Sequence, residues 1–361
     1  MDHPLIGLPI EDLDTPTLLL DGPACDRNVR RMAEFFRDRA CRLRPHFKNH
    51  KCTALAHRQQ QAGFTVGFTC AKLGEAEVLA AAGIRDLLIA NQVVGRRKTA
   101  RLIELAGRAD LTVAVDHPEQ IAALSEAASG AGVTVGVLVE VDVGMGRCGV
   151  APGEPALELA RLVVGRPGLR FRGLQAYEGH VVYQTDFDER ARQVREAMRH
   201  ALETRKLIED RGIEVAAVSG GATSTYRITG ALDGVDEIQA GTYPTMDWRY
   251  RQNAPEFEVA LSILARVISR RAGLAVLDVG AKGVGSDFGP PRVKGYDVEI
   301  RLPLSEEHCI VRNAPDWPLG QTVELLPSHA CTTCNLYRAM VVHADGRVAD
   351  VWPIEGSGRL Q

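Results

Sequence analysis

The sequence lacks a long apolar run, since none of its hydrophobic stretches reaches the roughly 18 residues that a membrane-spanning helix needs. It also lacks a surplus of one charge: 43 Lys and Arg stand against 46 Asp and Glu, so we expect no basic surface that holds a nucleic-acid backbone. The first residues have neither the basic start nor the apolar core of a secretory signal. We therefore expect a cytoplasmic protein with no membrane and no nucleic-acid partner.

The eight cysteines do not predict a disulfide framework. They are scattered over 361 residues, and we expect a cytosolic protein, whose thiols stay reduced. Most are interpreted as small buried apolar side chains. Cys331 and Cys334 form a Cys-x-x-Cys pair, for which a redox or structural-zinc role is one interpretation. The sequence has no second pair with zinc-ribbon spacing, which disfavours that role.

Strand-like and helix-like segments alternate from residue 24 to about residue 250. Eight strands are predicted, at residues 41–48, 64–71, 86–92, 111–116, 133–142, 170–177, 214–221 and 236–243. Eight strands that alternate with helices are typical of a (β/α)8 TIM barrel of the α/β class. An open, doubly wound sheet is the alternative.

The pattern changes after about residue 255, where short β-like runs are separated by Gly, Pro and Asp. We expect a mostly antiparallel β domain there, with a hairpin turn at residues 343–347. The predicted domains are a barrel over residues 22–252 and a C-terminal β domain over residues 253–361, which an early strand at 14–21 joins.

The end of the first predicted strand carries a candidate catalytic lysine. Side chains alternate along a strand, so Arg44, His46 and Lys48 are expected to face the barrel interior. Active sites of such barrels lie at the C-terminal ends of the strands, which places Lys48 at the mouth. A partly desolvated lysine suits Schiff-base chemistry. A buried ion pair is the alternative for Lys48, and Lys51 is a weaker candidate.

Two later strand ends have the features of anion sites. Ser219, Gly220 and Gly221 follow one strand and precede a helix, and Gly241 and Thr242 follow the next strand. Glycines let backbone N–H groups approach a phosphate, and phosphate sites after strands 7 and 8 recur in these barrels. Either segment alone could be an ordinary turn. Together with a lysine on strand 1 they suggest pyridoxal 5′-phosphate.

Seven short segments occur in order along the chain: 15–17, 44–51, 144–149, 173–180, 219–221, 239–243 and 327–331. With these segments the chain resembles the fold-type III pyridoxal-phosphate enzymes, and within them the D-threonine aldolase / D-serine dehydratase-like group. The resemblance covers nearly the whole chain. It implies an alanine-racemase-like barrel followed by a C-terminal β domain, and a homodimer with shared active sites.

The resemblance also implies roles around the cofactor. Lys48 is the Schiff-base lysine, Arg147 lies near the phenolic oxygen, and Gln239 faces the pyridine nitrogen, where alanine racemases carry an arginine. A structural salt bridge is the alternative for Arg147. The full implied cofactor set is Lys48, Arg147, Tyr177, Ser219, Gly220, Gly221, Gln239, Gly241, Thr242 and Tyr243.

Tyr177 and His180 are expected on the substrate side. An unperturbed imidazole titrates near neutrality, so His180 is a candidate acid or base. Its alternative role is a structural hydrogen-bond donor.

His329 and Cys331 are the candidate metal ligands. In an extended segment, side chains two positions apart point the same way. Imidazole plus thiolate suits Zn²⁺, with Mn²⁺ or Mg²⁺ as alternatives, and two protein ligands leave the shell open to water and substrate. The motif alone is weak, and the resemblance supports it because family members bind a divalent metal through this segment.

The favoured function is a lyase that depends on pyridoxal phosphate and a divalent metal and acts on D-3-hydroxy amino acids. The family's dehydratase-like members tend to have His-x-Cys, and its aldolase-like members His-x-Asp, so Cys331 favours a dehydratase of the D-serine or D-threo-3-hydroxyaspartate type. Its products are a keto acid and ammonia. The alternatives are retro-aldol cleavage to glycine and an aldehyde, an amino-acid racemase, and a non-catalytic carrier of the cofactor.

Overall fold

The computed structural model describes residues 3–361, which form two compact units. The barrel unit consists of Ala33–Lys48, Gln59–Gly241 and Arg359–Gln361. The sheet unit consists of the described residues up to Met32, with Asn49–Arg58 and Thr242–Gly358. Helices α1 (Gly22–Phe36) and α2 (Thr53–Gln61) each have residues in both units.

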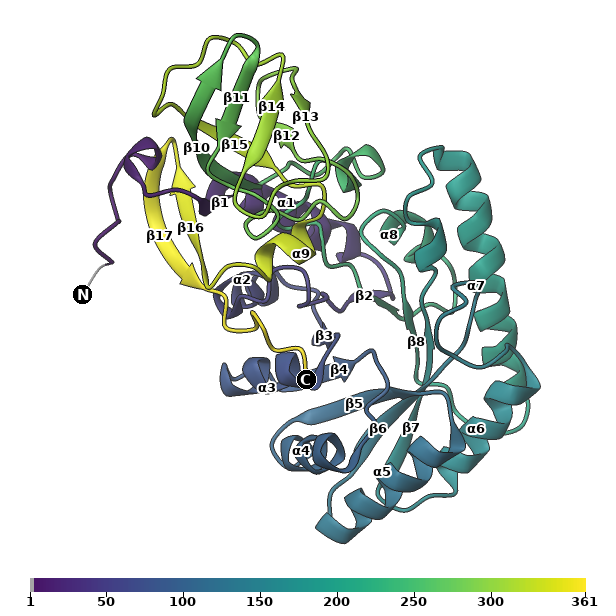
Figure 1. Cartoon of the computed structure of the whole chain (residues 1–361). Coiled ribbons are helices and arrows are strands. Elements are labelled where there is room, and N and C mark those ends of the chain that lie inside the picture. The colour runs from purple at the N-terminus through teal and green to yellow at the C-terminus, as the bar shows by residue number, and fades with distance from the viewer. Residues whose placement is uncertain (1–2) are drawn as a thin grey trace. The chain divides into compact units, whose positions relative to one another are not determined.

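The barrel unit contains eight parallel strands that alternate with helices (Figure 1). The strands are β2 (Arg42–Leu43), β3 (Phe68–Cys70), β4 (Asp86–Ile89), β5 (Asp110–Val115), β6 (Val135–Glu140), β7 (Leu169–Ala176), β8 (Ala217–Gly220) and β9 (Glu237–Ile238). The helices are α3 (Leu73–Ala81), α4 (Arg96–Ala106), α5 (Pro118–Ala131), α6 (Glu154–Val164), α7 (Phe187–Glu209) and α8 (Tyr226–Thr229).

The sheet of the barrel unit closes on itself. Its order is β2-β9-β8-β7-β6-β5-β4-β3, so the first strand pairs with the last. Parallel bridges join Leu43 to Thr65 and His46 to Thr69, which connects the β2 segment to the β3 segment on its other side. A ring of eight parallel strands is the (β/α)8 barrel that the sequence predicts, and an open sheet is excluded.

Local signals in the sequence explain where the barrel helices begin and end. In α5, Pro118 takes the first turn, where its missing N–H is not needed, and the ring nitrogen of His117 accepts from the Glu119 N–H at 3.2 Å. Gly132 ends the same helix at φ 67°, a left-handed conformation that glycine adopts without strain. Asp186 caps the long helix α7 by accepting from the Glu189 N–H at 2.8 Å.

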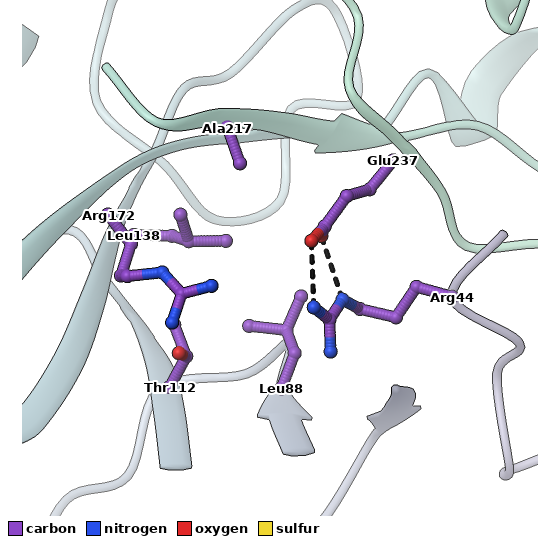
Figure 2. A pocket seen from close by; sticks show the side chains of 7 residues that line it. All are labelled: Arg44, Leu88, Thr112, Leu138, Arg172, Ala217 and Glu237. Atoms are coloured by element: carbon purple, nitrogen blue, oxygen red, sulfur yellow. Dashed lines mark hydrogen bonds and ion pairs between the residues drawn. The ribbon is translucent and has the colours of Figure 1, made fainter. Parts of the chain in front are cut away.

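The inside of the barrel holds a charged pair rather than only apolar layers (Figure 2). The guanidinium of Arg44 donates to both oxygens of Glu237 at 2.8 and 2.7 Å and to Asp86 at 2.6 Å. Burial raises the pKa of Glu237, but Arg44 outweighs this and holds it below its usual range. Arg44 therefore faces the interior, as the alternation predicts, and links Glu237 in β9 to Asp86 in β4.

The sheet unit contains nine strands and the short helix α9 (Ala330–Cys334). The strands are β1 (Thr17–Asp21), β10 (Leu261–Arg271), β11 (Leu274–Leu277), β12 (Arg292–Val293), β13 (Glu299–Ile300), β14 (Cys309–Arg312), β15 (Thr322–Leu326), β16 (Ala339–Ala344) and β17 (Arg347–Pro353). The short 3-10 turns η1 (Ile10–Asp12) and η3 (Tyr250–Gln252) belong to this unit, and η2 (Gly179–Val181) belongs to the barrel unit.

Most strand pairs of the sheet unit are antiparallel. The exception is β1, which runs parallel to β16 and antiparallel to β10, so a strand near the N-terminus lies inside a sheet built from the last hundred residues. The predicted hairpin is present: Asp345 and Gly346, both at positive φ, connect β16 to β17. The domain limits at residues 22, 252 and 253 stay a prediction.

None of the helices within residues 3–361 combines the length and the apolar character that a bilayer span requires.

Candidate functional site

Three of the predicted residues lie together in the barrel unit, each just after a strand. Lys48 lies in a turn after β2, Arg147 in the loop after β6, and Tyr177 directly after β7. The Lys48 Nζ is 5.9 Å from the centre of the Tyr177 ring, and the Arg147 guanidinium carbon is 5.8 Å from it. An amine and a guanidinium therefore flank one phenol ring at the C-terminal ends of the strands.

Lys51, the weaker lysine candidate, has a structural contact. It lies in the sheet unit, is 6% exposed, and donates from Nζ to the side-chain oxygen of Asn335 at 3.0 Å. Lys48 is more exposed than Lys51. These environments favour Lys48 as the reactive amine.

The loop that carries Arg147 is fixed by Asp142. The Asp142 carboxylate accepts from the backbone N–H groups of Gly144 and Gly146, both at 3.0 Å. Burial raises the pKa of Asp142, but these N–H groups outweigh it and lower the pKa overall. Within residues 3–361 Arg147 has no ion pair, so its guanidinium is not held by a structural salt bridge.

His180 lies on the same loop cluster and is exposed. Its ring packs over Gly144, where an added Cβ would lie 2.9 Å from the imidazole Cε1. The glycine thus makes room for the ring, and the exposure of His180 suits a group that exchanges protons with a ligand.

Gln239 belongs to a buried polar network across four neighbouring strand ends. Its Nε2 donates to the Ser219 hydroxyl at 2.9 Å and to the Gln175 side-chain oxygen at 3.3 Å. Gln175 lies opposite Glu140 in the β6–β7 register, and Glu140 accepts from Gln92 at 2.5 Å. Burial raises the pKa of Glu140 above its usual value. This network fixes the amide of Gln239.

The predicted phosphate loop has glycines where a side chain would not fit. A Cβ on Gly220 would lie 1.9 Å from the Ala176 carbonyl oxygen, and Gly221 has φ +78°. A Cβ on Gly241 would lie 2.9 Å from the His46 carbonyl oxygen. At Gly220 and Gly241 a neighbouring backbone segment passes too close for a side chain. We call these glycine positions the glycine cradle.

Glu178 is a site residue that the sequence analysis does not identify. Its fully buried carboxylate accepts from the Gly221 N–H at 3.1 Å, from Thr225 at 2.8 Å and from Thr229 at 2.5 Å. The Gly221 N–H is therefore engaged with the protein, and Gly221 shapes the loop rather than offering this donor to a phosphate. In the sequence, the only signal for a role of Glu178 is its position between Tyr177 and His180.

Thr242 and Tyr243 belong to the sheet unit. Thr242 is 9% exposed, and Tyr243 is completely buried, with its ring centre 6.0 Å from that of Phe257. Tyr243 is thus part of the packed interior of its unit.

The predicted metal ligands meet, but for a different reason from the one the sequence suggests. His329 is extended and caps α9, whereas Cys331 lies in the first turn of that helix, so the prediction of one extended segment is wrong. Burial lowers the pKa of His329, but the Cys331 thiol and the Asp287 carboxylate outweigh it and raise it to about 9. The imidazole thus lies between a sulfur and a carboxylate.

Three more residues of the sheet unit surround this pair. Asp287 lies 2.5 Å from the His329 Nδ1, and Asn49 donates to the Cys331 sulfur at 3.5 Å. Asp247 is buried, accepts from the Ala330 N–H at 3.0 Å, and has its pKa raised to about 6 by burial. Within residues 3–361 no group of three His, Cys, Asp or Glu side chains is arranged to hold a metal.

These residues fit the groups that the sequence predicts. An accessible amine, an unpaired guanidinium and a glycine cradle suit a phosphorylated aldehyde such as pyridoxal phosphate. An imidazole beside a thiol suits a divalent metal with open coordination positions.

Comparisons with known proteins agree with this description. Residues 20–247 match the family "Alanine racemase, N-terminal domain", and residues 260–343 match "Putative serine dehydratase domain". The chain is 39% identical to D-threonine aldolase of Arthrobacter sp, covering 98% of this chain and 95% of that protein. It is 32% identical to D-threo-3-hydroxyaspartate dehydratase of Delftia sp. (strain HT23), covering 93% and 96%.

The fold has a close counterpart among solved structures. The crystal structure of D-threonine aldolase from Filomicrobium marinum matches with a TM-score of 0.95 and 39% identity, covering 99% of each chain. The chain therefore belongs to the fold-type III pyridoxal-phosphate family, to its group of lyases in which an alanine-racemase-like barrel precedes a D-serine dehydratase-like domain.

Proposed function

We propose that this protein is a pyridoxal-phosphate- and metal-dependent lyase of D-3-hydroxy amino acids that cleaves the bond between Cα and Cβ, giving glycine and an aldehyde. The observation that carries the proposal is the arrangement of Lys48 and Arg147 around Tyr177 at the strand ends. Whole-chain identity supports the aldolase outcome, since D-threonine aldolase is 39% identical and the dehydratase 32%.

The cofactor would be held by residues of the chain with distinct tasks. The Lys48 amine would be the attachment point, Arg147 would neutralise the phenolic oxygen, and Ser219, Gly220, Gly241 and Thr242 would hold the phosphate. Bound pyridoxal phosphate supplies an electron sink for the pair of electrons left at Cα. Gln239 faces the ring with an amide instead of the arginine of alanine racemases, which disfavours a racemase.

The remaining chemistry is acid–base and electrostatic. His180, which is exposed beside Gly144, would take the proton from the β-hydroxyl as the Cα–Cβ bond breaks. With the cofactor bound, the Lys48 amine in its protonated form would donate the proton that Cα needs after the aldehyde leaves. A divalent metal held by His329 and Cys331 would polarise the β-hydroxyl as a Lewis acid.

Zn²⁺ is the metal we favour for an imidazole and a thiolate. A solved variant of the related dehydratase is described as metal-free, which supports a metal in this family group. That structure is 30% identical to this chain with a TM-score of 0.86, and covers 96% of this chain and 98% of its own.

Dehydration is the second candidate function, and Cys331 favours it. In that reaction the Lys48 amine removes the α-proton, hydroxide leaves Cβ, and the released enamine hydrolyses to a keto acid and ammonia. The same residues serve both reactions, so the difference depends on whether His180 takes the hydroxyl proton.

One product assay separates the candidates. The protein is loaded with pyridoxal phosphate and Zn²⁺ and given D-threonine, with L-threonine as the control. We expect equal amounts of glycine and acetaldehyde from the D isomer only. Formation of 2-oxobutanoate and ammonia would establish the dehydratase instead, and exchange of the α-proton without net breakdown a racemase.

A homodimer with shared active sites completes the proposal. Light scattering coupled to size-exclusion chromatography should give twice the mass of the chain, and a mass of one chain would contradict it.

A further inference from the structure

Each of the two predicted metal ligands has a hydrogen-bond partner of its own in the sheet unit. The carboxylate of Asp287 lies with Oδ2 at 2.5 Å from the His329 Nδ1, and its Oδ1 accepts from the Thr332 hydroxyl at 2.9 Å. Both oxygens of Asp287 are therefore engaged by residues at the start of α9. The ring of Phe288 lies 4.5 Å from the imidazole ring, centre to centre, and packs against it.

This contact decides which ring nitrogen of His329 is available. An ionised carboxylate can only accept hydrogen bonds, so Nδ1 must carry the proton in the contact with Asp287. In the neutral ring Nε2 then carries the lone pair. A metal-binding histidine commonly gives its other N–H to a carboxylate, which fixes the tautomer and the ring orientation.

Cys331 has a corresponding partner in Asn49. The amide nitrogen of Asn49 donates to the Cys331 sulfur at 3.5 Å, and its oxygen accepts from the Thr245 hydroxyl at 2.6 Å. Asn49 is completely buried. The Thr245 contact fixes the amide with its N–H groups toward the sulfur, so Asn49 holds the sulfur in position.

We propose that Asp287 and Asn49 are positioning residues of the metal centre. Asp287 holds His329 with Nε2 toward the metal, and Asn49 holds the sulfur of Cys331 in position by its N–H group. This inference rests on the proposed function, because it assumes that His329 and Cys331 bind the metal.

The test measures metal affinity without substrate. Zn²⁺ affinity is determined by competition with a chromophoric chelator for the wild type, D287A, D287N and the control D297N, each loaded with pyridoxal phosphate. Asp297 is an exposed acid of the same unit. We expect D287A to weaken binding about 10- to 100-fold, as loss of an outer-shell partner does. D287N keeps an acceptor oxygen and should recover part of the affinity, and D297N should match the wild type.

Co²⁺ provides the matching readout for Asn49. A thiolate bound to Co²⁺ gives a sulfur-to-metal charge-transfer band, and N49L should shift this band while D297N leaves it unchanged. Circular dichroism of each variant confirms that it is folded.

The outcomes separate the inference from the function on which it rests. A wild type that binds no Zn²⁺ would refute the metal site itself. A wild type that binds Zn²⁺ with the same affinity as D287A would overturn the role of Asp287, and an unshifted band in N49L that of Asn49. Complete loss of saturable binding in both D287A and D287N would make Asp287 a ligand rather than a positioning residue.

Discussion

At the scale of single residues, the site depends on places where only glycine fits. Gly220 lies so near the Ala176 carbonyl oxygen that a Cβ would be 1.9 Å from it. Gly130, inside helix α5, has no atom within 4 Å of the same position. Both glycines lie in regular elements, but the methyl group of an alanine would clash at Gly220 and would have open space at Gly130.

We predict opposite effects of alanine at these two positions. G220A must move a backbone and should lower the free energy of unfolding by about 1–3 kcal/mol, with weaker binding of pyridoxal phosphate. G130A should leave the free energy of unfolding unchanged or raise it by up to about 1 kcal/mol, since alanine is the better helix former. Urea titration at fixed protein concentration measures both, and equal effects would contradict the argument from close approach.

The sequence predicts residues well where a strand's alternation or a turn determines them. Alternation places Arg44 inside the barrel, and the structure confirms it. Glu178 could not be found in this way, because its partners Gly221, Thr225 and Thr229 are about fifty residues away and meet it only in the folded barrel. For the same reason, Asp287 cannot be linked to His329 from the sequence.

At the scale of elements, the loop between β8 and α8 is held by one carboxylate. Glu178 is the common acceptor for a backbone N–H and two threonine hydroxyls, and no part of it is exposed. The loop that we propose for the phosphate is therefore shaped from inside the protein before a ligand arrives.

We predict that E178Q loosens this loop. The glutamine replaces one acceptor oxygen with an NH₂ group where three donors point at the carboxylate, so the free energy of unfolding should fall by about 1–3 kcal/mol. The affinity for pyridoxal phosphate, measured by absorbance titration, should fall as well. E104Q, on the exposed face of α4, is the matched control. Unchanged affinity in E178Q would show that the loop does not need this carboxylate.

Element prediction succeeded where the chain has local signals and failed at α9. The eight barrel strands and the Asp345-Gly346 hairpin follow from periodicity and turn chemistry. Helix α9 has five residues, too few for a helical period, so the sequence suggests an extended segment at Cys331. The two predicted ligands come together because His329 is the N-cap residue of the helix that contains Cys331.

At the scale of the whole molecule, a buried histidine links stability to pH. His343 in β16 is 6% exposed, and its Nδ1 has no hydrogen-bond partner within residues 3–361. Burial lowers its pKa, with Lys294 acting in the same direction and Asp21 and Glu324 opposing. The neutral ring is thus favoured in the folded protein.

We predict that part of the stability is lost as the pH falls below about 6.5, the usual histidine pKa. Below that pH, His343 binds a proton more readily in the unfolded chain than in the folded protein. Protonation therefore stabilises the unfolded state relative to the folded state. H343Q should flatten this part of the profile in urea titrations between pH 5 and pH 8, values chosen to span the pKa. H308Q, at an exposed position, should follow the wild type. An unchanged slope in H343Q would assign the effect to other groups.

The most direct test of the account is the bond between the cofactor and the chain. The purified protein is loaded with pyridoxal phosphate, reduced with borohydride and digested, and the modified peptide is sequenced by mass spectrometry; K48A and K51A are treated in the same way. The account predicts one adduct, on Lys48, present in K51A and absent in K48A. An adduct on Lys51, or none in the wild type, would contradict it.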